Sequence, residues 1–157
     1  MKTFREYLNE AKGGKYELTD ETTKVRGKTL YQIKALKSFG KVKAGDLGGY
    51  IESEKNLSQS GNAWVGGKAE VYGKAKVYGN AVVLDNAQVF DKAEVYGKAK
   101  VFGNARVYDD AKVFGNASLS DFAQAFNKAQ VLDNAQVSGY AEAGGNTKIS
   151  SNEIVSD

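Results

Sequence analysis

A six-residue repeat fills most of the chain and restricts its fold more than any other feature. Aligned from Leu47, eighteen hexads run to Ile154, and the unit VYGKAK occurs at both 71–76 and 95–100. The first position is aliphatic in nearly every hexad, and the fifth is alanine in fourteen consecutive hexads, from Ala63 to Ala141. Repetition at a fixed period is typical of stacked architectures, so one main body is expected for the 157 residues.

Each hexad encodes one short strand and one corner. Residues two apart on a strand share a face, so the alanine and the aliphatic residue after it point inward while the residue between them points outward. The third position is Gly, Asp, Asn or Ser in every hexad from Gly61 through Ser151, and these types bend the backbone at low steric cost. Three corners close a triangular coil of 18 residues, so the eighteen hexads predict six stacked coils.

The pattern resembles the hexapeptide-repeat signature of left-handed β-helices, in which an aliphatic residue is followed four positions later by a small one. The resemblance covers residues 47–154 and implies an all-β fold, a left-handed parallel β-helix. One departure is the second position, which is usually small in that family. Here it is often aromatic.

These aromatic side chains form columns, because residues 18 apart lie directly above one another. In-register ladders of like side chains stabilise stacked coils by themselves, and a ligand-binding aromatic stripe is the alternative. A single tryptophan is predicted to point outward on one face. The candidate binding surface is one column of Tyr72, Phe90, Tyr108 and Phe126, a second column of Tyr78, Tyr96 and Phe114, and Trp64.

Residues 11–46 form a linker and a cap that do not follow the hexad. The segments 16–18 and 29–36 predict strands around a turn near Arg26-Gly27, which would cover the unpaired backbone of the first coil. At the other end, residues 155–157 are assigned to a tail. The polar residues from Ser150 onward are expected to fray.

The first eleven residues predict a short amphipathic helix. Thr3 and Glu6 make a capping box, and apolar residues follow at helical spacing ahead of a flexible segment at 12–15. A helix of this length is marginal in water. A docking peptide and a frayed end are therefore both open on physical grounds.

Residues 1–10 look like the capsid-targeting leader of the internal head proteins of T-even-type bacteriophages. Those leaders are cut by the prohead protease after a Leu/Ile-x-Glu motif. Here Leu8-Asn9-Glu10 is the only such triplet in the chain, and the cut is expected before Ala11. The resemblance implies a cleavable leader with the prohead protease and the capsid scaffold as its partners.

No enzyme is expected, because the chain contains no His, the commonest general base near neutral pH. The repeat body is similar to phage and bacterial hexapeptide-repeat proteins of the acyltransferase-like group, and that resemblance implies a His general base. Asp91, Asp109 and Asp121 could replace it in principle, but each occupies a corner where Asp is expected for turn geometry. Asp91 and Asp109 alone supply too few oxygens for Ca²⁺, so no metal is expected. No cofactor is expected either.

Net charge and hydropathy indicate which classes of partner to expect. The net charge is +3 from 22 basic and 19 acidic residues, and the basic residues are spread along the repeat, which gives no support for a nucleic-acid partner. No apolar run approaches the roughly 20 residues that span a bilayer, so no membrane partner is expected. Hexapeptide-repeat proteins often form trimers, which makes a homo-oligomer a candidate state, but the faces here are mixed in charge and leave that state open.

Three functions follow from these patterns. The first is a phage internal head protein, packaged in the virion interior, trimmed after Glu10, and delivered with DNA to the host cytoplasm, where it binds and inhibits a host defence protein. The second is a structural or assembly component of the virion. The third is a hexapeptide-type acyltransferase, which the missing His disfavours. The first is the function we favour, since the surface of a rigid column can bind a partner by shape and charge alone, and the second would use the same faces for permanent contacts.

Overall fold

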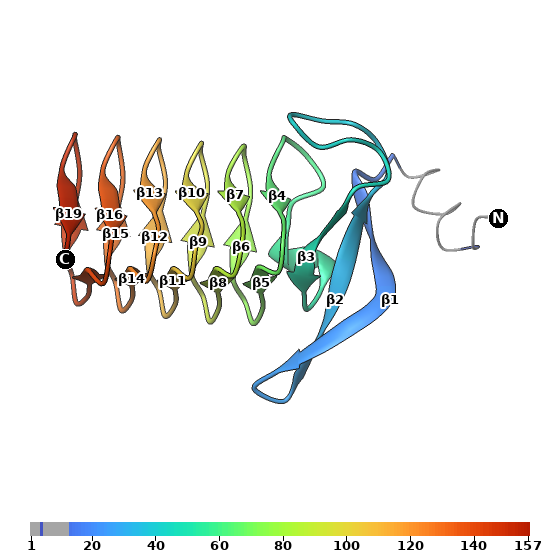
Figure 1. Cartoon of the computed structure of the whole chain (residues 1–157), viewed down its shortest axis with the longest axis horizontal. Coiled ribbons are helices and arrows are strands. Elements are labelled where there is room, and N and C mark those ends of the chain that lie inside the picture. The colour runs from blue at the N-terminus through green and yellow to red at the C-terminus, as the bar shows by residue number, and fades with distance from the viewer. Residues whose placement is uncertain (1–3, 5–12) are drawn as a thin grey trace.

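The computed structural model describes residue 4 and residues 13–157 of the chain. These residues form a parallel β-solenoid of six stacked coils with an antiparallel hairpin at its N-terminal end (Figure 1). The predicted β-helix is confirmed, and the arrangement is consistent with the left-handed form. The cleavage motif at residues 8–11 lies outside the described residues, as does the predicted leading helix except for residue 4.

A hairpin of β1 (Tyr16–Val25) and β2 (Lys28–Ala35) caps the solenoid. Its turn has positive φ at Arg26 (51°) and Gly27 (77°), at the position predicted for it. β3 (Leu47–Ile51) pairs antiparallel with β2 on one side and in parallel with the next solenoid strand on the other. The cap and the solenoid thus share one continuous sheet, and β3 is the strand at which the pairing changes direction.

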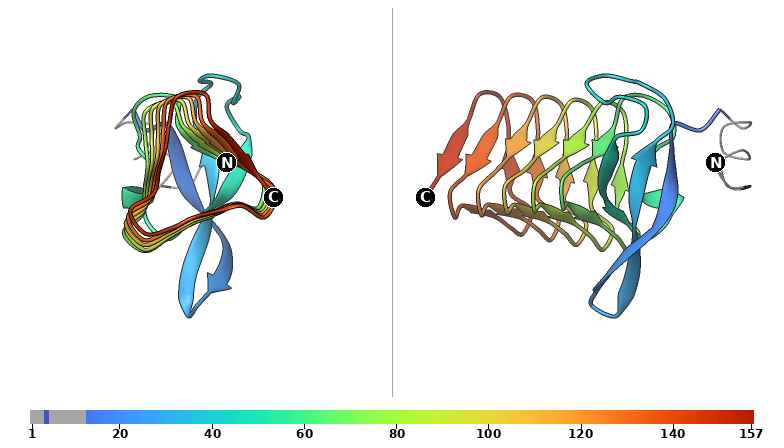
Figure 2. Two further views of the ribbon diagram at one scale, coloured as in Figure 1. Left: turned by 90° about the vertical axis from the view of Figure 1, so that its left-hand side faces the viewer. Right: turned by 45° about the vertical axis from the view of Figure 1, so that its right-hand side comes forward.

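Three parallel faces make up the solenoid, and each coil adds one short strand to each face. The first face continues from β3 through β5 (Glu70–Val71), β8 (Gln88–Val89), β11 (Arg106–Val107), β14 (Gln124–Ala125) and β17 (Glu142–Ala143). The second consists of β4 (Trp64–Val65), β7 (Val82–Val83), β10 (Lys100–Val101), β13 (Ser118–Leu119), β16 (Gln136–Ser138) and β19 (Ile154–Ser156). The third consists of β6 (Lys76–Val77), β9 (Glu94–Val95), β12 (Lys112–Val113), β15 (Gln130–Val131) and β18 (Lys148–Ile149). Seen along the axis, the stacked coils enclose a triangular outline (Figure 2).

The register between coils is 18 residues, as predicted. Lys100 pairs with Ser118 on the second face, and Arg106 pairs with Gln124 on the first. The backbone follows this register, since the Arg106 N–H donates to the Ala123 carbonyl at 3.0 Å. Each coil is therefore hydrogen-bonded to the coil above it along all three faces.

Alanine and valine fill the interior of the solenoid. The fifth-position alanines and first-position valines are almost all fully buried, while the residue between them is at least partly exposed in every strand from β5 onward. Tyr16, Ile33 and Ile51 extend the same core into the cap. Burial of this apolar surface is the main stabilising term, and it is continuous along the axis.

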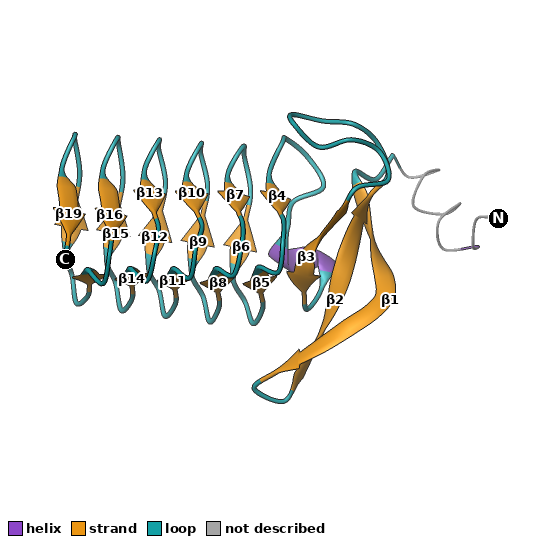
Figure 3. Ribbon diagram, in the orientation of Figure 1, coloured by secondary structure: helices purple, strands orange, loops and turns teal. Residues whose placement is uncertain are grey.

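The described residues contain little helix. η1 (Glu54–Asn56) is a single 3₁₀ turn within the first coil, beside β3 (Figure 3). No helix among the described residues has the length and apolar character that crossing a membrane requires.

The C-terminal residues continue the solenoid, so the prediction that they fray from Ser150 onward is wrong. β19 pairs in parallel with β16, matching Ile154 to Gln136 and Val155 to Val137. The physical reason is that Val155 occupies the first position of a further hexad. It extends the inward ladder by one step, and the assigned tail at 155–157 is part of a strand.

Candidate functional site

The two predicted aromatic columns are stacks of nearly parallel rings. Successive ring centroids lie between 4.9 and 5.4 Å apart, with interplanar angles between 2° and 9°. One stack runs through Tyr72, Phe90, Tyr108 and Phe126, and the other through Tyr78, Tyr96 and Phe114. The columns therefore hold adjacent coils together from outside, and ligand binding by their rings stays a prediction.

The cap covers the first half of the longer column, which the repeat pattern does not predict. Tyr72 and Phe90 are only 3% and 2% exposed, and they form a cluster with the buried Leu30 of β2. The Arg26 guanidinium lies over the Phe90 ring, 4.5 Å from its centroid. These two rings therefore anchor the hairpin and are not a free binding surface.

Trp64 also lies under non-repetitive structure. It occupies the outward position of β4, yet it is only 6% exposed because the loop at 36–46 folds over it. Phe39 of that loop packs edge-on against the indole, with centroids 5.4 Å apart and an interplanar angle of 68°. The outward direction predicted for Trp64 is present, but the exposure that a free surface needs is not.

The second column is left uncovered by the cap. Tyr78, Tyr96 and Phe114 are all half-buried along the corner between two faces. The Tyr78 hydroxyl donates to Glu94 Oε2 at 3.2 Å, and burial, together with that carboxylate, raises the pKa of Tyr78 to about 12. Near neutral pH this column presents aromatic surface with protonated phenols.

A third aromatic stack was missing from the sequence prediction. Phe122 and Tyr140 stack at 5.0 Å and 5°, and they are 48% and 67% exposed. They occupy the fourth position of hexads one coil apart, so the 18-residue spacing was a usable signal. Exposed aromatic rings are enriched in contact surfaces, which makes this pair the most accessible ring stack in the described part of the solenoid.

The corner aspartates connect coils through their side chains. Asp91 and Asp109 both adopt positive φ, 58° and 56°. Asp91 Oδ2 accepts the Asp109 N–H at 3.3 Å, and Asp109 Oδ2 accepts the Asn127 N–H at 2.9 Å. Asp121 accepts the Gly139 N–H in the same way, at 3.0 Å. These contacts favour the turn interpretation of all three aspartates over a role as general base.

A hollow of about 600 Å³ borders one row of these corners. Asp91, Asp109 and Asp110 line it together with Lys92 and Lys128. Opposite charges alternate there, so no one class of ligand is favoured by charge. Across the described residues, no group of three or more His, Cys, Asp or Glu side chains is placed to hold a metal ion.

Substitutions of Asp109 separate the effect of its side-chain hydrogen bond on stability from the effect of its left-handed backbone. Asp109→Ala removes the bond to Asn127 and keeps a Cβ in a left-handed backbone, so we expect a loss of about 1–2 kcal/mol in the free energy of unfolding. Asp109→Gly removes the same bond but relaxes the backbone, so the loss should stay within about 0.5 kcal/mol. Urea denaturation of the two variants measures the difference. Equal losses would contradict this explanation of the corner.

Lys15 is a buried cation that the sequence prediction did not single out. It is 1% exposed, and its Nζ donates to the Ala63 carbonyl at 2.7 Å and the Gly61 carbonyl at 3.4 Å. Burial, with a smaller contribution from nearby Lys37, lowers the pKa of Lys15 to about 8. The ammonium satisfies carbonyl groups of the first coil and lies 4.9 Å from the Phe39 ring, so it supports the loop over Trp64.

Comparison with known proteins identifies no relative of the chain. No protein-family model matches the chain, and no curated protein is significantly similar to it.

Proposed function

We propose that the chain is an internal head protein of a bacteriophage, packaged through residues 1–10 and trimmed after Glu10. The observation that carries the proposal is the resemblance of this segment to capsid-targeting leaders, with Leu8-Asn9-Glu10 as the chain's only Leu/Ile-x-Glu triplet. A body without further sites of this kind would survive beside the prohead protease. The trimmed chain begins at Ala11 and contains the whole solenoid.

The trimmed body acts by binding and not by catalysis. The proposal rests on the absence of His and Cys from the sequence and on the turn contacts made by the corner aspartates. The proposed partner is a host defence protein, met after delivery of the body with the DNA. The uncovered aromatic surfaces are the proposed contacts, namely the Tyr78 column and the exposed pair of Phe122 and Tyr140.

Mass spectrometry of purified, nuclease-treated virions tests this proposal. We expect a chain whose first residue is Ala11, and we expect a Glu10→Ala variant to be packaged untrimmed because the protease motif is broken. A Glu21→Ala variant, outside the motif, is the matched control and should be trimmed normally. Recovery of only full-length chain outside particles would overturn the proposal. Trimmed chain that stays in emptied particles after DNA ejection would assign it to virion structure instead.

A further inference from the structure

A groove crosses the second face of the solenoid where the loop between β2 and β3 arches over the first coils. Its volume is about 390 Å³, within the range of small-molecule sites. Loop residues 40–42 form one wall, and β4, β7 and β10 contribute the floor (the loop and strands are visible in Figure 1). The groove is separate from the aromatic columns and from the corner hollow.

The loop is held in a fixed position over this face. Phe39 and Val42 exchange backbone hydrogen bonds at 3.0 and 2.8 Å, which closes the loop tip around Gly40. Phe39 then packs edge-on against Trp64, and the Lys15 ammonium lies over the Phe39 ring. The wall of the groove is therefore built on buried contacts and is formed before any ligand arrives.

The floor of the groove is apolar. Val82 lies in the outward position of β7, directly above Trp64 of β4, and Leu84 lies at the neighbouring corner. Val82 and Leu84 are both half-buried and so retain accessible apolar surface. An outward strand position on this scaffold is usually polar, as at Lys100 one coil above. The floor therefore offers apolar surface that would be covered by the body of a ligand.

The rim of the groove is cationic. Lys41 projects from the loop, Lys98 lies at the corner, and Lys100 lies on β10. No carboxylate lines the groove, and within the described part of the chain no ion pair joins these three lysines to an acidic side chain. Three ammonium groups around one concave surface favour an anion, since their fields add.

The amides at the rim add hydrogen-bond donors. Asn80 Oδ1 accepts the Asn62 N–H at 3.2 Å, which leaves the Nδ2 group of Asn80 to donate to a ligand. Ammonium and amide donors together match the acceptor-only oxygens of a phosphate or a carboxylate.

We propose that this groove binds a small organic anion, whose ring or apolar body lies on Val82 and Leu84 and whose phosphate or carboxylate lies among Lys41, Lys98 and Lys100. A molecule of about mononucleotide size fits the volume of the groove. This binding activity goes beyond the proposed packaging and does not depend on it. The virion experiment and the binding experiment use different readouts, so the failure of one proposal can be told from the failure of the other.

Trp64 gives the test a built-in reporter, because it is the only tryptophan in the chain and it forms the end of the groove floor. Phenyl phosphate, which carries both a ring and a phosphate, is titrated while Trp64 fluorescence is recorded. We expect a saturable change. Phenol and inorganic phosphate, each lacking one half of the ligand, should bind at least about ten-fold more weakly. Benzoate in a parallel titration distinguishes a preference for carboxylate from one for phosphate.

Matched variants locate the binding. Lys98→Gln/Lys100→Gln should weaken phenyl phosphate binding by about ten-fold or more, since two of three cations are lost. Lys128→Gln/Lys148→Gln makes the same change of charge outside the groove and should leave binding unchanged. Val82→Glu, at a half-exposed position, tests the floor independently and should abolish binding while the fold is retained by circular dichroism. The absence of a saturable change, or equal affinity in the Lys98/Lys100 variant and its control, would overturn the proposal.

Discussion

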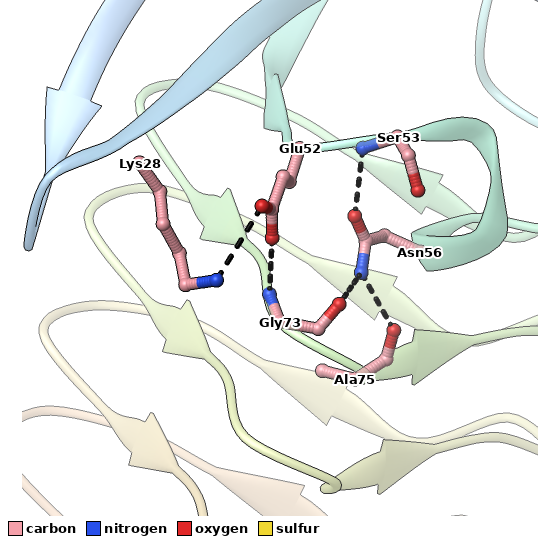
Figure 4. A network of polar contacts seen from close by, with 6 residues as sticks. All are labelled: Lys28, Glu52, Ser53, Asn56, Gly73 and Ala75. Atoms are coloured by element: carbon pink, nitrogen blue, oxygen red, sulfur yellow. Dashed lines mark hydrogen bonds and ion pairs between the residues drawn. The ribbon is translucent and has the colours of Figure 1, made fainter.

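An Asn56→Asp substitution is expected to lower the free energy of unfolding by about 3–5 kcal/mol, although it replaces a single NH₂ group. Asn56 ends η1 and is completely buried. Its Nδ2 donates to the Gly73 carbonyl at 3.2 Å and the Ala75 carbonyl at 2.9 Å, while its Oδ1 accepts the Ser53 N–H at 2.9 Å (Figure 4).

The cost arises because a carboxylate cannot donate. It would bring a buried negative charge against two carbonyl oxygens and leave both without a partner. Protonation would restore one donor, so the loss should shrink as the pH falls through the raised pKa of the introduced Asp. Urea denaturation followed by Trp64 fluorescence measures the effect close to the first coil.

Asn104→Asp is the matched control, because Asn104 is an exposed fourth-position residue like many others in the repeat. Its effect on the free energy of unfolding should stay within about 0.5 kcal/mol. If Asn56→Asp lowered the free energy of unfolding by less than about 1 kcal/mol, the hydrogen bonds of Asn56 Nδ2 would contribute little to the stability of the first coil.

Asn56 also illustrates what the repeat could not reveal. In the hexad alignment it is a fourth-position residue, where Asn and Lys are usually exposed at corners. Here the Ser53 cap and the 3₁₀ turn rotate it into the interior. The departure from the standard corner occurs in the hexads 47–52 and 53–58 of the first coil, which lack alanine at the fifth position. There the sequence no longer predicts the standard corner.

The solenoid itself was predictable because its rules are local. The inward positions, the positive-φ corners and the 18-residue columns all follow from alternation on a strand and from three corners per coil. The ring stacks and the pairing of Arg106 with Gln124 confirm that register. The C-terminal strand followed the same rule through Val155, and the polar residues on either side of Ile154-Val155 concealed it.

The placement of the cap was not predictable from the same rules. The strands and turn of the hairpin were foreseen, but hydrophobic patterning does not say which face a hairpin will cover. The hairpin packs on Tyr72 and Phe90, and the loop covers Trp64. Three of the eight aromatic candidates are therefore buried and not part of the free surface. The groove proposed as an anion site arises from the same long-range packing, since its wall and floor are distant in sequence.

A Val107→Asp substitution is expected to cost more than about 4 kcal/mol and to break the solenoid in its middle. Val107 is fully buried in β11, between Val89 of the coil below and Ala125 of the coil above. A carboxylate there has no polar partner among these apolar neighbours. Because each coil contacts mainly its neighbours, unfolding should begin at this coil while the capped N-terminal coils retain structure.

Arg106→Asp provides the control one residue away. Arg106 points outward and is exposed, so the same aspartate there should change the free energy of unfolding by no more than about 0.5 kcal/mol. Amide hydrogen exchange of both variants locates the damage: protection should be lost from β11 onward in Val107→Asp and kept in Arg106→Asp. Similar amide protection in the two variants would refute the assignment of Val107 as inward and Arg106 as outward. The whole repeat depends on this assignment, because a shift of one residue exchanges the two faces of a strand.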